Sequence, residues 1–253
     1  MVFNEGVQKS NLLDGLIIAF EGLDCSFKET NCIEFINKIS LDMPYQDIIT
    51  ESFPRYNEDS SMFIKKWLNN EYDRELLSKK PLAINSCYSL DRLDFWMGKN
   101  NIFRRSMMNY RDRFCFIFDR YSYSNSIYNP MYPNQMPNIN DFRFDNDTFG
   151  IPYPDIVVWM RMKNFGVLLD LISQKKDKDK NELDTAFLEM VWNRSEYMIK
   201  HNWLEGDLPT SFITIDCLND YDMIKSRDLI ASEVYKQVMN TAEKIKKNRK
   251  EYR

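Results

Sequence analysis

Short apolar runs recur along the chain and alternate with segments of helical periodicity. The runs are rich in β-branched and aromatic residues and have no polar face, which is typical of strands buried on both sides of a sheet. Strands that alternate with helices predict a parallel sheet covered by helices on both faces. The predicted strands are Leu16–Glu21, Asp47–Phe53, Arg113–Asp119, Asp155–Met162 and Ser211–Asp216.

The sequence also predicts helices and irregular segments between and around these strands. Residues 129–154 are rich in Asn and Pro and predict a long loop with some local helix. We expect a polar lead-in over residues 1–14, one domain over residues 15–240, and a basic tail over residues 241–253 that frays. The predicted helices are Lys28–Ile39, Ser60–Leu68, Leu82–Trp96, Asn181–Ile199 and Asp222–Ile245.

Composition excludes several classes of function. The 34 basic and 38 acidic residues give a net charge of −4, which argues against a nucleic-acid-binding protein. No apolar run is long enough to span a membrane, and the N-terminus does not resemble a secretory signal. The five cysteines lack C-x-x-C spacing, so we expect free thiols in a reducing, cytoplasmic setting. The single histidine, His201, leaves carboxylates, lysine, arginine and a metal to carry any chemistry.

The corner after the first strand resembles a phosphate-binding loop of the pattern G-x-x-x-x-G-K-[ST]. The strand runs into Gly22, Lys28 follows six residues later, and a helical segment comes next. In such a loop, backbone N–H groups and the helix N-terminus surround the anion, and the lysine adds a positive charge. Two positions depart from the pattern, because Phe27 stands in place of the second glycine and Glu29 in place of Ser/Thr. The alternative is an ordinary strand–turn–helix corner.

Phe27 and Glu29 differ in how strongly they would disturb phosphate binding. A bulky residue in a left-handed conformation costs about 1–2 kcal/mol, so Phe27 is tolerable in a site that gains several hydrogen bonds. Glu29 is the more serious change, because a carboxylate there either ligates Mg²⁺ or repels phosphate. A third possibility is that Glu29 points outward and interacts with the helix dipole.

Six segments occur in an order that resembles one enzyme family. They are "FEGLDCSFKET", "ESFPRYN", "CYSLDRLDF", "FIFDRYSYSNSIY", "PDIVVWMRM" and "DKNELDTAFLEMVWNRSEYM". Together they resemble the thymidylate kinases, P-loop enzymes that pass a phosphoryl group from ATP to dTMP. The resemblance spans about residues 15–216. It implies a P-loop NTPase-type, three-layer α/β sandwich with a five-stranded parallel sheet.

The resemblance implies catalytic roles around the phosphate loop. Lys28 is similar to the lysine that bridges the donor phosphates. Asp24 resembles the loop carboxylate near the acceptor, which also anchors Mg²⁺; the alternative is a turn-forming Asp. Arg120 resembles the arginine that clamps the acceptor phosphate, and Asp119 orients it or a metal-bound water; the alternative is a structural Asp–Arg pair. The implied ATP-binding segment is Gly22, Leu23, Asp24, Cys25, Ser26, Phe27, Lys28, Glu29 and Thr30.

On the acceptor side, the resemblance implies a phosphate contact and a base pocket. Arg55 is similar to the arginine that meets the acceptor phosphate. Tyr88 aligns with an aromatic residue that stacks on thymine, and Arg92 with an arginine that donates to its carbonyl; four residues apart, they share one helix face. Asn125 resembles an amide that reads the pyrimidine edge. The remaining implied dTMP neighbours are Phe53, Tyr56 and Tyr128.

The charged segment at residues 173–182 falls where the family has a lid over ATP. Taken alone, such a run predicts only a solvated loop. The resemblance implies that Lys178 and Lys180 contact the ATP phosphates and that Glu182 contacts the metal or its waters. Lys175 and Lys176 complete the lysines of this lid, which has no arginine.

The leading hypothesis is therefore a thymidylate kinase that uses ATP and Mg²⁺ and, by resemblance, forms a homodimer. One alternative is an impaired relative that binds nucleotide or a protein partner without transferring phosphate, motivated by Phe27, Glu29 and the arginine-free lid. Another alternative keeps the chemistry and changes the acceptor to dUMP or another deoxynucleotide.

Overall fold

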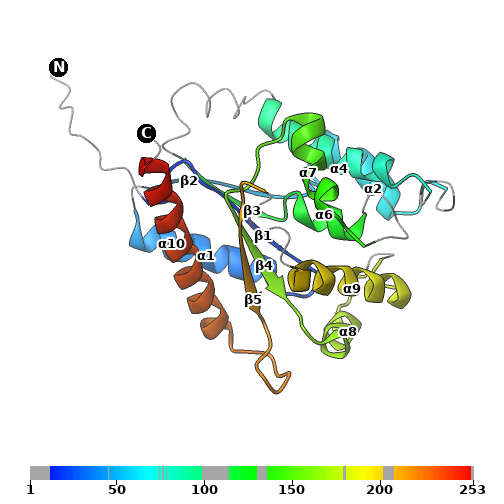
Figure 1. Ribbon diagram of the computed structural model, residues 1–253. Helices are drawn as coiled ribbons and strands as arrows, with labels where there is room; N and C mark the ends of the chain where they lie inside the picture. Colours follow the sequence, from blue (N-terminus) through cyan, green and yellow to red (C-terminus); the bar gives the residue numbers. More distant parts are fainter. Residues whose placement is uncertain are drawn as a thin grey trace.

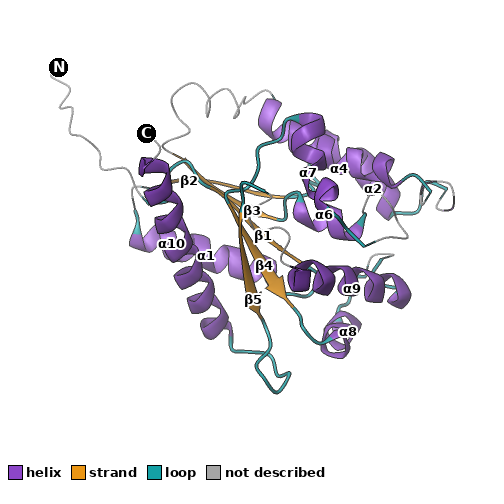
Figure 2. Cartoon of the chain, viewed as in Figure 1, coloured by secondary structure: helices purple, strands orange, loops and turns teal. Residues whose placement is uncertain are grey.

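The structure, a computed structural model, describes residues 12–44, 46–73, 75, 77, 79–98, 114–129, 136–178, 181–201 and 208–251. Its centre is a five-stranded sheet in which every pair of neighbouring strands is parallel (Figures 1 and 2). The strand order is β2-β3-β1-β4-β5. The predicted parallel sheet is confirmed, and its strands are β1 (Ile17–Gly22), β2 (Asp47–Ser52), β3 (Phe114–Asp119), β4 (Ile156–Arg161) and β5 (Ser211–Asp216).

The register of the sheet brings chemistry-bearing residues to one edge. Every residue of β1 is buried, as expected for a central strand with helices on both faces. Phe20 of β1 lies opposite Asp119, and Ser52, the last residue of β2, also lies opposite Asp119. The carboxyl ends of these strands therefore meet at one edge, where ligands bind in open α/β sheets.

One face of the sheet is covered by α1 (Lys28–Asp42) and α10 (Arg227–Glu251), which contact each other (Figure 1). Helix α10 extends to Glu251 and so includes most of the segment predicted as a basic tail. Ala242 is fully buried, and Lys246 donates to the backbone carbonyl of Asp14. These contacts anchor the C-terminal turns of the helix. Its start is also later than predicted, since Ile224 forms an isolated bridge with Leu218.

The remaining helices lie around the carboxyl edge of the sheet (Figure 1). In the predicted loop at residues 129–154 the structure has helix α7, which begins with a capping box between Asn138 and Asp141. Helix α8 was not predicted, and α9 begins four residues later than predicted. The elements are η1 (Asp59–Ser61), α2 (Met62–Leu68), α4 (Pro81–Met97), α6 (Tyr123–Tyr128), α7 (Ile139–Phe149), α8 (Phe165–Gln174) and α9 (Thr185–His201).

Two expectations from composition are met in the described residues. All five cysteines are free, and three of them are buried. Every helix in these parts of the chain is too short or too polar to cross a bilayer. Predicted residues that fall outside the description include Arg113 at the start of one strand and Lys180 in the lid.

Candidate active site

The loop between β1 and α1 turns tightly enough to form a phosphate cradle. Gly22 has φ +146°, and a Cβ there would lie 2.6 Å from Ser26 Oγ and 2.7 Å from the Met160 carbonyl oxygen. Only glycine fits at this point. Cys25 (φ 59°) and Phe27 (φ 62°) also have left-handed backbone conformations. Successive turns of this kind direct backbone N–H groups into a concavity that suits an anion.

Phe27 adopts the conformation that a glycine at its position would take freely. Its φ of 62° and ψ of 17° place it in the left-handed region immediately before α1. For a bulky residue this conformation costs about 1–2 kcal/mol. The ring is half-buried and packs partly against the hydrophobic core, which offsets part of that cost. The loop therefore keeps its shape without the second glycine.

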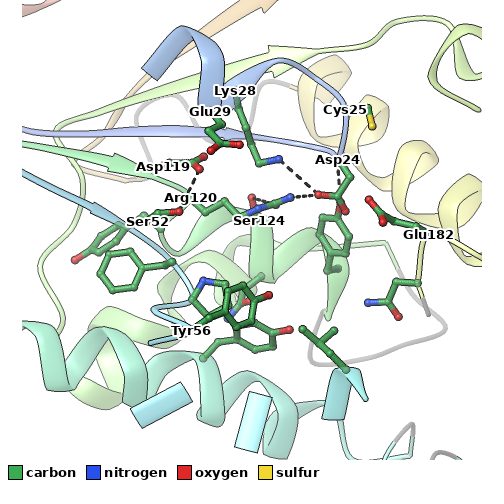
Figure 3. Close-up of a pocket in the computed structure, with 18 of the residues that line it drawn as sticks. Asp24, Cys25, Lys28, Glu29, Ser52, Tyr56, Asp119, Arg120, Ser124 and Glu182 are labelled. Carbon is green, nitrogen blue, oxygen red and sulfur yellow. Dashed lines mark hydrogen bonds and ion pairs between the residues drawn. The ribbon is translucent and has the colours of Figure 1, made fainter. Parts of the chain in front are cut away.

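Lys28 is the first residue of α1, and its side chain turns back over the loop (Figure 3). Its Nζ donates to the backbone carbonyl of Leu23 at 3.2 Å and lies 3.6 Å from Asp24 Oδ1. Burial lowers the pKa of this amine, as does the nearby Arg120 charge, while Asp24 acts in the opposite direction. A buried ammonium group is thus held at the base of the cradle.

Asp24 forms ion pairs with both cations at this site, as Figure 3 shows. Arg120 pairs with it through Nη2, and Arg120 Nη1 donates to the Gly22 carbonyl at 3.2 Å. The hydroxyl of Tyr128 donates to Asp24 Oδ2 at 3.0 Å. Burial raises the pKa of Asp24, but Arg120 and then Lys28 oppose it and hold the pKa well below its usual value. The carboxylate therefore stays charged and fixes Arg120 over the loop.

Arg120 itself follows β3 in a left-handed conformation with φ 61°, and a buried acid supports the turn around it. Glu21, the residue before Gly22, is fully buried. Its carboxylate accepts from the backbone N–H groups of Tyr121 at 3.0 Å, Tyr123 at 2.8 Å and Ser124 at 3.0 Å. Sequence reasoning missed this role, although a carboxylate that closes an apolar strand was a visible signal.

A cavity of about 540 Å³ joins the phosphate loop to the helices on the opposite face. Gly22, Leu23 and Ser26 lie in the loop but do not line this cavity, and Ser124 and Lys175 line it although neither was among the predicted site residues. The predicted residues that it brings together are Asp24, Cys25, Phe27, Lys28, Glu29, Thr30, Phe53, Tyr56, Tyr88, Arg92, Asp119, Arg120, Asn125, Tyr128 and Glu182.

Two of the residues that line the cavity, one on α4 and one on α6, have a hydrogen-bond donor without a partner among the described residues. Arg92 is buried; its Nη1 donates to the Tyr121 carbonyl at 2.9 Å and its Nε pairs with Asp145, but its Nη2 is unpartnered. The Nδ2 amide of Asn125 is likewise buried and unpartnered. Tyr88, one helical turn before Arg92, lines the same space. Unpaired buried donors are costly, so this part of the cavity suits a ligand with acceptor oxygens.

Arg55 does not line the cavity. Its guanidinium is occupied by α4, because Nε donates to Asp91 Oδ1 at 3.1 Å and Nη2 to Asp94 Oδ2 at 2.6 Å. Nη2 also contacts Ser60 Oγ at 2.9 Å. Arg55 thus connects the segment after β2 to helix α4. Its predicted contact with an acceptor phosphate stays a prediction.

In the lid, the lysine at the cavity is Lys175. Its Nζ donates to Glu182 Oε1 at 2.7 Å, which links the two ends of the lid segment across the cavity. Burial lowers the pKa of Lys175, but the hydrogen bond to Glu182 and its charge outweigh that effect and raise it. Lys178, which was predicted to reach ATP, instead donates to the Ser173 carbonyl at 2.8 Å and does not line the cavity.

The three predicted metal ligands differ in what already binds them. Asp24 pairs with Arg120 and Lys28, and Glu182 pairs with Lys175. Asp119 accepts from Ser52 at 3.2 Å through Oδ2, whereas its Oδ1 is buried and accepts no hydrogen bond from the described residues. This orphaned oxygen suits a divalent cation or one of its waters. Among the predicted residues, Asp119 therefore fits the implied Mg²⁺ best.

Comparison with known proteins adds a sequence relative and two structures. No protein-family model matches the chain. The thymidylate kinase of Caenorhabditis elegans is 28% identical over 184 residues, which is 69% of this chain and 73% of that protein. The structure of thymidylate kinase from Ehrlichia chaffeensis superposes with a TM-score of 0.57 and 17% identity, over 88% of this chain and 98% of that one. The Candida albicans thymidylate kinase gives 0.56 and 16%, over 90% and 94%. At these identities the two structures establish the fold.

Proposed function

We propose that this chain, which belongs to the thymidylate kinase family, transfers the terminal phosphoryl group of ATP to dTMP and yields ADP and dTDP. One observation carries the proposal: a single cavity combines the phosphate loop with the unpartnered donors of Arg92 and Asn125. A buried donor without a partner costs about 1–3 kcal/mol, so a ligand that satisfies both is favoured. The carbonyl oxygens of thymine supply such acceptors.

The residues at the loop supply positioning and charge, which is what phosphoryl transfer chiefly requires. The acceptor phosphate is itself an anionic nucleophile, so the site needs no strong base. Lys28 is buried beside the loop and holds its ammonium group where donor phosphates would enter. The left-handed turns at Cys25 and Phe27 leave backbone N–H groups to bind the same phosphates.

Arg120 is the residue that we assign to the transferring group. Its planar guanidinium matches phosphate oxygens, and its pair with Asp24 keeps it oriented across the cavity. Tyr128, hydrogen-bonded to Asp24, steadies the same carboxylate. Mg²⁺, when bound, would neutralise phosphate charge, and Asp119, whose buried Oδ1 accepts no hydrogen bond from the described residues, would help to hold it.

The family resemblance further leads us to propose a homodimer in the cytoplasm. Sedimentation equilibrium of the purified chain tests the dimer: a mass near twice 30.4 kDa supports it, and a mass near 30.4 kDa contradicts it.

A coupled assay of ADP release tests the proposed reaction. With ATP, Mg²⁺ and dTMP, the wild-type chain should turn over, and Lys28→Ala should reduce kcat by at least about a thousandfold. Lys38→Ala is the matched control, because Lys38 lies on the same helix, is exposed and pairs only with Asp42 among the described acids. Parallel reactions with dUMP and dCMP identify the preferred acceptor. The absence of dTMP-dependent ADP release from the wild type would overturn the proposal.

A further inference from the structure

The residue after Lys28 is an acid where phosphate loops have a hydroxyl, and the structure gives its direction. Glu29 lies in the first turn of α1 and is exposed. It also lines the cavity, and Figure 3 shows its carboxylate directed toward that of Asp119. Glu29 therefore faces the region that the donor phosphates would occupy.

The proximity of the two carboxylates is supported by their effect on a third group. Burial raises the pKa of the Cys32 thiol, and the charges of both Asp119 and Glu29 raise it further. Both acids thus lie within electrostatic reach of one side chain of α1. Asp119 ends β3, and its Oδ2 accepts from Ser52. Its Oδ1 remains buried and without a partner among the described residues.

The cations of the site do not neutralise this pair directly. Lys28 and Arg120 both feel the charge of Asp119, but the ion pairs that the described residues give them go to Asp24. Two carboxylates that face the same space repel each other unless a cation lies between them. The unpartnered Oδ1 of Asp119 and the exposed carboxylate of Glu29 can therefore bind a positive ion without giving up a hydrogen bond or ion pair to the described residues.

The two carboxylates alone are too few to enclose a metal ion. Among the described residues there is no group of three or more His, Cys, Asp or Glu side chains that could enclose a metal. Mg²⁺ commonly binds through one or two carboxylates and fills its remaining positions with waters and substrate phosphates. A hydroxyl in place of Glu29 would add no charge. The carboxylate raises the number of charged ligands, which strengthens divalent-cation binding.

We propose that Glu29 and Asp119 form a divalent-cation site that takes up its ion before any nucleotide is present. The inference rests on the proposed function, since it identifies the position of the metal in that same site. The change from hydroxyl to carboxylate would then be an adaptation that retains a metal at the loop, and would not be the loss of the metal site.

Binding of Mn²⁺ to the nucleotide-free full chain tests this proposal. Free Mn²⁺ is measured by electron paramagnetic resonance, whose signal falls when the ion binds. The wild type should bind one Mn²⁺, and Glu29→Ser and Glu29→Gln should each weaken that affinity at least about tenfold. Glu189→Gln, which removes the same charge from an exposed position on α9, should leave it unchanged. Equal affinity in the wild type and both Glu29 variants would overturn the proposal.

Asp119→Asn supplies a second, independent arm, because it changes the other ligand and leaves Glu29 intact. It should weaken Mn²⁺ binding to a similar extent, and a wild-type affinity in this variant would also overturn the proposal. Circular dichroism of each variant verifies that the helices are retained. Failure of the proposed function gives a different result: no dTMP-dependent ADP release, while Mn²⁺ binding still depends on Glu29.

Discussion

Arg120 and Asp24, which are 96 residues apart in the sequence, form an ion pair at the phosphate loop. The same carboxylate lies 3.6 Å from Lys28 Nζ and accepts from the hydroxyl of Tyr128 at 3.0 Å. Asp24 thus connects the loop after β1 to the loop after β3 and to helix α6. Both connections require the charged carboxylate. Protonation of Asp24 should therefore lower the stability of the folded protein.

We predict that Asp24 contributes stability at neutral pH that disappears in acid. Its pKa is lower in the folded protein than its ordinary value of 3.8, so the folded state binds fewer protons there than the unfolded state. The contribution is therefore present in full above pH 3.8 and is lost as the pH falls through the folded-state pKa. Urea unfolding of the wild type and Asp24→Asn should show a difference in free energy that is largest near pH 7 and shrinks below pH 3.8.

Glu189→Gln is the matched control, because it removes the charge of an exposed acid on α9. Its stability relative to the wild type should change little over the same range. A difference between the wild type and Asp24→Asn that is constant with pH would contradict the ion-pair account.

Glu21 should act as a positioning residue for Arg120. In Glu21→Gln, one carboxylate oxygen becomes an NH₂ donor that faces the donors of the turn after Arg120, among them the Tyr123 and Ser124 N–H groups. We expect a loss of about 1–3 kcal/mol in the free energy of unfolding. We also expect kcat to fall by up to about a hundredfold, while the KM for ATP stays within about threefold of the wild-type value. Wild-type kcat in a folded Glu21→Gln protein would show that the turn does not depend on this acid.

Because Phe27 has a left-handed backbone conformation, we predict that glycine is more stabilising than alanine at this position, the reverse of their usual order in a helix. Phe27→Gly and Phe27→Ala both remove the ring, but only alanine retains the strain of a side chain at φ 62°. Phe27→Gly should therefore be more stable than Phe27→Ala by about 1 kcal/mol. At an ordinary position, such as exposed Ile33 within α1, glycine should instead be less stable than alanine by about 0.5–1 kcal/mol. Thermal or urea unfolding of the four variants distinguishes the two cases.

The sheet and most of its helices could be predicted from the sequence, because doubly buried strands leave a clear pattern of apolar runs. The prediction was less complete where a local pattern was weak. Helix α7 lies in a segment rich in Asn and Pro, for which the sequence predicted a long loop with some local helix; the capping box at Asn138 stabilises the start of this 11-residue helix. The C-terminal turns of α10 are basic and look exposed, yet Lys246 and Ala242 are held by tertiary contacts that no local rule reveals.

The site divides in the same way. The loop from Gly22 to Lys28 is contiguous, so its pattern indicated the cradle despite two altered residues. The capture of Arg55 by Asp91 and Asp94 could not be anticipated, because those partners lie 36 and 39 residues away on α4. Which lid lysine reaches the cavity also depends on the path of the backbone, and spacing alone does not give that path.

Lys175 should be the lysine of the lid that matters for ATP. Both Lys175 and Lys176 are exposed, but only Lys175 lines the cavity, where it donates to Glu182. We predict that Lys175→Ala weakens ATP binding about tenfold in calorimetry, because a partly desolvated charge near the phosphates is lost. Lys176→Ala, with the same change in net charge, should weaken it by less than about twofold. Equal effects of the two variants would mean that the lid acts only through its overall charge.

The free amide of Asn125 predicts how the acceptor base is selected. Asn125→Asp preserves the shape of the side chain but replaces the unpartnered Nδ2 donor with a carboxylate oxygen. A carbonyl oxygen of thymine would then face an acceptor, and one desolvated negative charge would lack a donor. We expect kcat/KM for dTMP to fall by about a hundredfold or more, since a site built around a hydrogen bond strongly disfavours a mismatch. The KM for ATP should change little, because Asn125 belongs to α6 and not to the loop between β1 and α1. An unchanged kcat/KM for dTMP in the folded variant would mean that this amide does not contact the base.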